Sequence, residues 1–172
     1  MAAPIVIIDL QTGMFDGVVS SPVHDADGLV RRVRQVMDWA RRHGRKIAFV
    51  QQNSPPGDQL EPGTPGWQIW PALGRAADEP SFGKTITNAF SNRDLVDWVA
   101  GQGDDVILMG AATNHCVAAS VAGGMAAGLK VTVVADAHST GGKMAPDIIA
   151  EHNAAFAAAG AEVVTASELT AR

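Results

Sequence analysis

The 172-residue sequence predicts an α/β fold in which helices flank a mostly parallel sheet. Short runs rich in Val and Ile alternate along the chain with segments whose apolar residues recur at helical spacing, which is typical of parallel strands joined by crossover helices. Ala and Gly are abundant and aromatic residues make up only 5%, so we expect closely packed elements and an aliphatic core. No shift in composition divides the chain, and residues 1–172 are predicted to form one domain.

In the first half of the chain, two buried strands are expected on either side of an amphipathic helix. Residues 4–9 and 46–51 are short, apolar runs rich in β-branched side chains, as buried strands are. The segment between them places apolar residues on one helical face and arginines on the other, and it ends near Gly44. Its apolar face consists of Leu29, Val33, Val36 and Ala40, with Val30 and Met37 beside them.

In the second half, helices and strands are expected to alternate three times. The first of these helices is predicted from the spacing of Leu95, Val96 and Val99, and the second segment is rich in Ala. Each strand is again predicted from a short run rich in Val. The predicted order is helix 92–100, strand 105–109, helix 114–127, strand 130–135, helix 146–159 and strand 162–165.

The segment 53–80 interrupts this alternation. It is rich in Pro and Gly, yet it carries Trp67, Ile69 and Trp70. A loop of this length inside a compact domain is usually functional or disordered. The tryptophans favour an ordered loop over the edge of the sheet, either as a lid or simply as packing anchors.

Charge and the N-terminal sequence exclude several classes of partner. The formal net charge of −5 gives no electrostatic footprint for nucleic acid. The first ten residues lack a basic region, and their apolar run is too short for a signal peptide or a membrane span. We therefore expect a soluble, cytoplasmic protein that binds neither nucleic acid nor membrane. The one dense basic cluster is interpreted as a solvated helix face, and it contains Arg31, Arg32, Arg34, Arg41 and Arg42.

Cys116 is the single cysteine, which excludes an internal disulfide and argues against a structural zinc site. It lies just after the strand 105–109, at the start of the Ala-rich helix. A thiol in the first turn of a helix is expected to have a lowered pKa, and the free amide groups of that turn could hold an oxyanion. Position alone leaves two alternatives open, a nucleophile or a buried structural cysteine.

Two further side chains are candidates for chemistry. Asp9 follows the run Ile5–Ile8, at the end of the sheet where doubly wound folds bind ligands, although it could also cap a turn. Lys84 stands out from the other three lysines because it occupies a short apolar stretch after the long loop. A cation there could keep Asp9 ionised and favour a thiolate, whereas a surface lysine is the default interpretation.

The sequence lacks the motifs of several other enzyme classes. There is no G-x-S-x-G elbow, no Walker loop, no G-x-G-x-x-G after the first strand and no H-E-x-x-H, and the histidines show no metal-ligand spacing. His115 is adjacent to Cys116, and neighbouring helical residues face different directions, so it is a poor candidate for a base. His138 could either line the crevice or cap a loop.

Four blocks of sequence occur in a characteristic order and spacing. Residues 7–11 read I-I-D-L-Q, Lys84 is followed by N-A-F at 88–90, residues 110–117 read G-A-A-T-N-H-C-V, and residues 131–137 read V-T-V-V-A-D-A. Together they resemble the I-D-x-Q, lysine, G-x-x-T-[DN]-x-C-V and V-x-V-V-x-D-A blocks of the isochorismatase-like cysteine hydrolases, which include nicotinamidases and N-carbamoylsarcosine amidohydrolase. The resemblance covers nearly the whole chain.

This resemblance implies a doubly wound, six-stranded sheet of order 3-2-1-4-5-6, an Asp9-Lys84-Cys116 triad and a cis peptide bond between Ala111 and Ala112. It also implies an oxyanion hole made by the amides of Ala112 and Cys116. Nicotinamidases carry a metal-binding D-x-H after the second strand, where this chain reads Q-N-S-P at 52–55. We therefore expect no metal and no other cofactor, as in the metal-free, amidase-like branch of the family.

The expected activity is hydrolysis of a C–N bond, in an amide, carbamoyl or lactam group of a small molecule, through a thioester intermediate. The alternatives are an isochorismatase-type ether hydrolase, which needs no covalent intermediate, and a non-catalytic α/β ligand-binding domain. The resemblance also implies a homodimer or homotetramer, while the sequence does not identify the substrate. The predicted substrate-binding residues are Phe15, Gln52, Asn53, Trp67 and Phe82.

Overall fold

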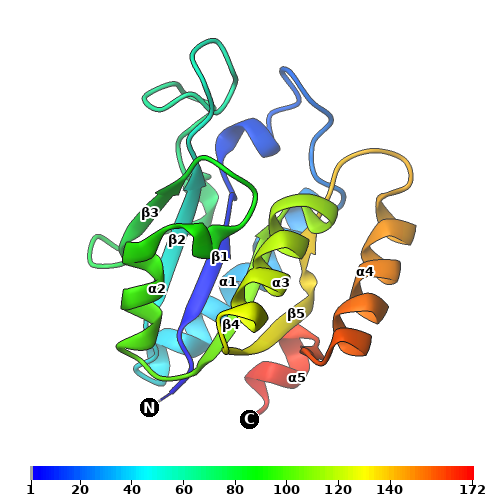
Figure 1. Cartoon of the computed structure of the whole chain (residues 1–172). Coiled ribbons are helices and arrows are strands. Elements are labelled where there is room, and N and C mark those ends of the chain that lie inside the picture. The colour runs from blue at the N-terminus through cyan, green and yellow to red at the C-terminus, as the bar shows by residue number, and fades with distance from the viewer. Residues whose placement is uncertain (1) are drawn as a thin grey trace.

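A six-stranded parallel sheet forms the centre of the molecule, in the order β3-β2-β1-β4-β5-β6 (Figure 1). The structure is a computed structural model and describes residues 2–172. Every pair of neighbouring strands is parallel, so the predicted doubly wound sheet and its order are confirmed. The strands are β1 (Ile5–Ile8), β2 (Ile47–Gln52), β3 (Ser81–Lys84), β4 (Asp105–Ala111), β5 (Lys130–Ser139) and β6 (Glu162–Val164).

Helices cover both faces of the sheet (Figure 1). Ile5 and Ile7 of β1 pack in one core with α1 and α5, while Val6 and Ile8 pack in a second core with α2, α3 and α4. Because successive strand residues point to opposite faces of the sheet, this apolar strand contributes side chains to both cores. The helices are α1 (Ala26–Arg42), α2 (Arg93–Ala100), α3 (Ala118–Ala126), α4 (Ala145–Ala159) and α5 (Ala166–Thr170). Within residues 2–172 no helix is long and apolar enough to cross a bilayer.

Two elements were not predicted from their own residues. The sequence of β3, S-F-G-K, contains no β-branched residue, and it is a strand because it pairs with the end of β2. Helix α5 is short, and Thr165 and Glu168 form a capping box at its start. The helix predicted at 114–127 also differs, since a π-helical turn, Thr113–Val117, precedes α3.

The long loop 53–80 is ordered and is fastened to the segment that follows β1. The amides of Thr12 and Gly13 donate to the carbonyls of Gln68 (2.8 Å) and Gly66 (2.9 Å), and Gln11 forms an antiparallel bridge with Ile69. These contacts place the loop beside the carboxyl end of the sheet, where it projects from the molecule (Figure 1).

Gly110 allows β4 to approach β1 closely. Its φ is +140°, and a Cβ atom at this position would lie 2.1 Å from the carbonyl oxygen of Ile8. Gly110→Ala is therefore expected to lower the free energy of unfolding by about 3 kcal/mol, as measured by urea denaturation. The matched control is Gly44→Ala, where φ is also positive but the space is open. In that control we expect the free energy of unfolding to fall by only about 1 kcal/mol. Equal decreases in the two variants would contradict the steric explanation.

Candidate active site

Three side chains from three elements meet at the carboxyl end of the sheet. Asp9 directly follows β1, Lys84 is the last residue of β3, and Cys116 lies in the π-helical turn after β4. The Lys84 Nζ atom lies 2.8 Å from Asp9 Oδ2 and 3.1 Å from Cys116 Sγ. The structure therefore brings together the three residues that the sequence singled out.

Lys84 and Asp9 form a buried ion pair. Their side chains are 0% and 3% exposed, respectively. The Lys84 ammonium also donates to Gln52 Oε1 (2.5 Å), so its three protons face a carboxylate, an amide oxygen and the thiol. This arrangement fixes the position of the cation between the carboxylate and the sulfur.

Gln11 orients Gln52, and its importance was not recognised from the sequence beyond its place in the first block. The Gln11 side chain is fully buried and accepts from the Gln52 amide (2.9 Å). It also donates to the carbonyls of Gln52 (3.2 Å) and Trp67 (2.9 Å). Gln11 thus links the long loop to the residue that holds Lys84.

Asp9 has the properties of a proton acceptor. Burial raises its pKa above the ordinary value of 3.8, and the positive charge of Lys84 opposes that shift only in part. Its Oδ1 atom is buried and has no hydrogen-bond partner among the described residues. The backbone of Asp9 is left-handed, with φ at +51°, a conformation that aspartate tolerates better than most residues and that clusters at functional sites.

The Cys116 thiol does not have the lowered pKa that its place near a helix start suggested. Burial, and then the negative charge of Asp9, raise the pKa of Cys116 to about 12, while Lys84 lowers it. The sequence-based expectation was therefore wrong for the resting state, because it considered the helix end and neither the burial of the thiol nor the neighbouring carboxylate. At neutral pH the group is a thiol, and reaction requires a base close to it.

A cavity of about 310 Å³ opens over the sulfur atom. Its walls come from the chain after β1, the start of the long loop, the segment after β3 and the π-helical turn. Asp9, Cys116 and Ala112 were predicted as triad and oxyanion-hole residues, and Gln52 belongs to the predicted substrate-binding set. The remaining wall residues were not anticipated. The lining consists of Asp9, Met14, Gln52, Ser54, Leu60, Thr85, Ile86, Thr87, Ala112, His115 and Cys116.

The other four predicted substrate-binding residues do not line this cavity. Phe15 stacks on Trp70, with ring centroids 4.8 Å apart. Trp67 donates through Nε1 to Asn53 Oδ1 (2.8 Å), so both side chains serve the loop itself. Phe82 packs against Trp98 of α2, in the core that contains Val6 and Ile8. The tryptophans thus act as packing anchors, although a lid movement of the loop stays a prediction.

The peptide bond between Ala111 and Ala112 is cis, as the family resemblance implied. Ala112 lies at the cavity wall next to the π-helical turn, and its carbonyl accepts from the amides of His115 (3.1 Å) and Val117 (3.2 Å). His115 is exposed at the cavity wall. Among residues 2–172, no three His, Cys, Asp or Glu side chains are grouped so that they could hold a metal ion.

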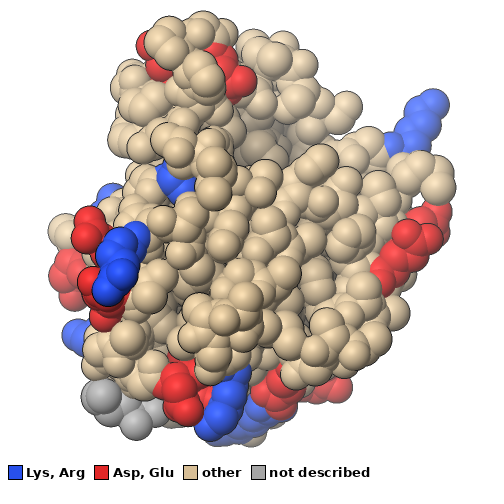
Figure 2. Space-filling view, viewed as in Figure 1, with Lys and Arg blue, Asp and Glu red and all other residues tan. Residues whose placement is uncertain are grey.

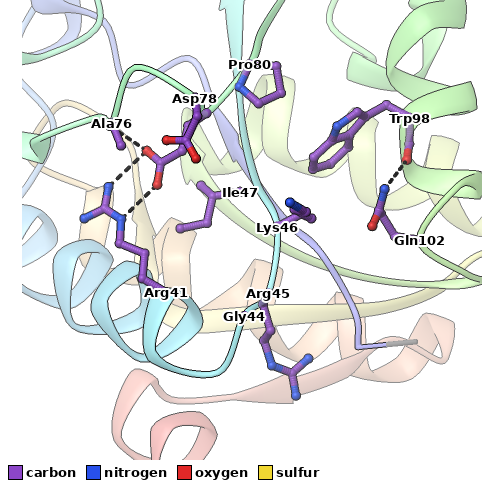
Figure 3. Close-up of a pocket in the computed structure, with 11 residues that line it drawn as sticks. Arg41, Gly44, Arg45, Lys46, Ile47, Ala76, Asp78, Pro80, Trp98 and Gln102 are labelled. Atoms are coloured by element: carbon purple, nitrogen blue, oxygen red, sulfur yellow. Dashed lines mark hydrogen bonds and ion pairs between the residues drawn. The ribbon is translucent and has the colours of Figure 1, made fainter.

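A second cavity, of about 570 Å³, lies at the opposite end of the sheet, before β2 and β3 (Figure 3). Glu79 lines it, and its carboxylate is already bound by Arg41 (2.8 and 3.0 Å) and by the Ala76 amide (2.8 Å). Although this cavity is larger, none of Asp9, Lys84 and Cys116 belongs to its wall. The smaller cavity, which contains Asp9 and Cys116, is therefore the candidate active site.

Comparison with known proteins shows the family to which the chain belongs. Residues 3–168 match the family model described as the isochorismatase domain. Two curated proteins of Streptomyces noursei, both named streptothricin hydrolase, are 28% identical over 137 residues and 27% identical over 167 residues. These alignments cover 79% and 96% of this chain, but only 54% and 60% of the relatives. The chain thus spans little more than half the length of these curated relatives.

Solved structures with the same fold include two from Pseudomonas. An isochorismatase from Pseudomonas putida KT2440 is 27% identical, with a TM-score of 0.88, covering 96% of this chain and 89% of that one. A cysteine hydrolase from Pseudomonas syringae pv. phaseolicola 1448A has a TM-score of 0.88 at 19% identity, covering 98% and 90% of the two chains. The second comparison supports the fold alone.

Proposed function

Because the chain belongs to the isochorismatase family, we propose that it is a cysteine hydrolase that cleaves a C–N bond of a small molecule through a thioester on Cys116. The observation that carries this proposal is the position of Lys84 Nζ, 2.8 Å from Asp9 and 3.1 Å from Cys116, beneath a cavity. The bond cleaved would belong to an amide, a carbamoyl group or a lactam. The family supplies the hydrolase class, and the site supplies the nucleophile.

In the first half of the reaction, the Cys116 proton passes to the Asp9 carboxylate while the sulfur attacks the carbonyl carbon. The π bond of the carbonyl opens to an oxyanion, for which the amides of Ala112 and Cys116 are the proposed donors. The oxyanion then re-forms the carbonyl, the C–N bond breaks, and the nitrogen leaves with the proton from Asp9. The product of this half is a thioester.

In the second half, Asp9 takes a proton from a water molecule as the water oxygen attacks the thioester carbon. Collapse of the tetrahedral intermediate breaks the C–S bond, and Asp9 returns the proton to the sulfur. Lys84 stays charged throughout, so the cluster has the same net charge before and after the proton leaves the thiol. A proton that moves within a neutral cluster needs no counter-ion from solvent, which explains how a thiol with a pKa of about 12 can react at neutral pH.

The cavity favours this chemistry over hydrolysis of the vinyl ether of isochorismate. Isochorismate carries two carboxylates, and neither Lys nor Arg is among the residues that line the cavity at Cys116. The part of the long loop at the top of Figure 2 shows acidic residues and no basic ones. The Lys84 ammonium already pairs with Asp9 and donates to Gln52, so it is not free to bind a substrate carboxylate. An uncharged or cationic substrate suits this surface better than a dianion.

The test is a panel of small amides, carbamoyl compounds, lactams and isochorismate, with streptothricin included because of the relatives' name. We expect turnover of at least one C–N substrate and, after acid quench, an intact mass increased by the acyl group on the peptide that contains Cys116. Turnover of isochorismate alone, without an adduct, would replace the proposal by the ether hydrolase. No turnover together with an unreactive thiol would favour a binding domain.

A further inference from the structure

His138 is a buried histidine that the mechanism above does not use. It lies near the end of β5 and is 2% exposed. Its Nδ1 atom is 2.9 Å from the Thr113 hydroxyl, and its Nε2 atom is 2.9 Å from Asn153 Oδ1 in α4. Of the two alternatives left open for His138, lining the crevice is not the one found, because the ring is not in the wall of the cavity at Cys116. The ring instead connects the π-helical turn to α4.

The hydrogen bonds of Asn153 determine which nitrogen of His138 donates and which accepts. Asn153 Nδ2 donates to the Ala135 carbonyl (2.9 Å), which leaves Asn153 Oδ1 as the acceptor that faces His138. His138 must then carry its proton on Nε2, and its Nδ1 atom accepts from the Thr113 hydroxyl. Burial also lowers the pKa of His138 below 6.5, which keeps the ring neutral and able to accept at pH 7.

Thr113 is the first residue of the π-helical turn that contains Cys116, and it is fully buried. A second bond holds the same turn, because the Thr140 hydroxyl donates to Asn114 Oδ1 (2.9 Å). The register between β4 and β5 shifts so that His138 lies opposite Gly110, just before the turn. His138 near the end of β5 and Thr140 just after it are therefore bonded to two successive residues of the turn.

We propose that His138 is a positioning residue for the nucleophile. By accepting from Thr113 and donating to Asn153, it fixes the turn against β5 and α4, and so keeps Cys116 Sγ beside Lys84 and Asp9. His138 does not touch the reacting atoms, and its role rests on the proposed function of Cys116. The alternative is a histidine that only fills the core against Phe156, with ring centroids 5.9 Å apart.

Two matched pairs of variants separate these roles. Thr113→Val removes the hydroxyl at constant shape, whereas Thr113→Ser keeps it. His138→Leu removes both ring contacts, whereas His138→Gln keeps one donor and one acceptor without a titratable group. We expect Thr113→Val and His138→Leu each to lower kcat about tenfold at unchanged KM, while Thr113→Ser and His138→Gln stay within about threefold of the parent.

The double variant Thr113→Val/His138→Leu should be no slower than the slower single variant, because both changes break one connection. The rate of Cys116 alkylation by iodoacetamide at pH 7, followed by intact mass, should fall in parallel with kcat. This second measurement needs no substrate, so it still tests His138 if no C–N substrate is hydrolysed. Unfolding midpoints show which variants remain folded, and Thr113→Val tests the same connection if His138→Leu does not fold.

The control is His43→Gln, at the exposed end of α1, which should change neither rate. Equal losses in Thr113→Val and Thr113→Ser would overturn the proposal. So would a double variant whose loss is the product of the two single losses, or an alkylation rate that stays unchanged in folded Thr113→Val.

Discussion

Replacing Cys116 by alanine is expected to lower kcat/KM by about 10⁴-fold or more on any substrate that the parent protein hydrolyses. The chain has no second cysteine, so no other thiol can take over the attack. The measurement is steady-state turnover, combined with intact mass after acid quench, where the acyl adduct should disappear.

Stability provides the control for Cys116→Ala. The Cys116 side chain is only partly buried, and after the change Lys84 retains its contacts with Asp9 and Gln52. We expect the free energy of unfolding to change by no more than about 1 kcal/mol. Cys116→Ser should be almost as inactive, since a hydroxyl is a much weaker nucleophile at the same position. Undiminished turnover in Cys116→Ala would contradict the thioester mechanism.

Asp9→Asn is expected to affect both activity and stability, because it removes the base and the partner of a buried cation. Without the carboxylate, no base remains to take the Cys116 proton and pass it to the leaving nitrogen, and kcat should fall by about 10³- to 10⁴-fold. The buried Lys84 ammonium also loses its counter-charge, which should cost roughly 3–5 kcal/mol of unfolding free energy. Turnover and urea denaturation measure the two effects.

The double variant Asp9→Asn/Lys84→Met separates the two effects. Removing the uncompensated cation should restore much of the stability while activity stays lost. In the parent protein, kcat should rise with pH as Asp9 ionises, with a midpoint above 3.8 because burial raises its pKa. That acid limb should be absent from the residual activity of Asp9→Asn. Recovery of turnover in the double variant would show that Asp9 supports the fold and not the chemistry.

The α/β fold and the places of Asp9 and Cys116 at strand ends could be predicted from the sequence, whereas the strand order and the role of Lys84 were implied by the family resemblance. Val- and Ile-rich runs identified five strands, and parallel strands bring their carboxyl ends to one edge. Asp9 and Cys116 follow two of these runs, so their meeting depends little on side-chain detail. β3 could not be identified from its own residues, since its strand conformation comes from pairing with β2.

The residues of the cavity wall and the raised pKa of Cys116 could not be predicted from the sequence, for different reasons. The wall comes from segments without periodicity, such as 85–87, and Trp67 and Trp70 are used to hold the loop instead of lining the cavity. The pKa of Cys116 depends on how deeply it is buried beside Asp9, which a position in a helical turn does not determine. Gln11 belongs to the first sequence block, but its role could not be predicted, because its hydrogen-bond partners lie in a strand and a loop that are distant along the chain.

The link that Gln11 makes between the long loop and Gln52 bears on how proteins of this kind diversify. The reacting groups lie at strand ends, whereas residues 54–60 and 85–87 supply much of the cavity wall. Mutations in these segments can remodel the space for a new molecule while the nucleophile and base stay in register. The segment 66–69, which hydrogen-bonds to residues 11–13, is the part that such remodelling has to leave intact. Selection can thus act on ligand choice and on chemistry almost separately.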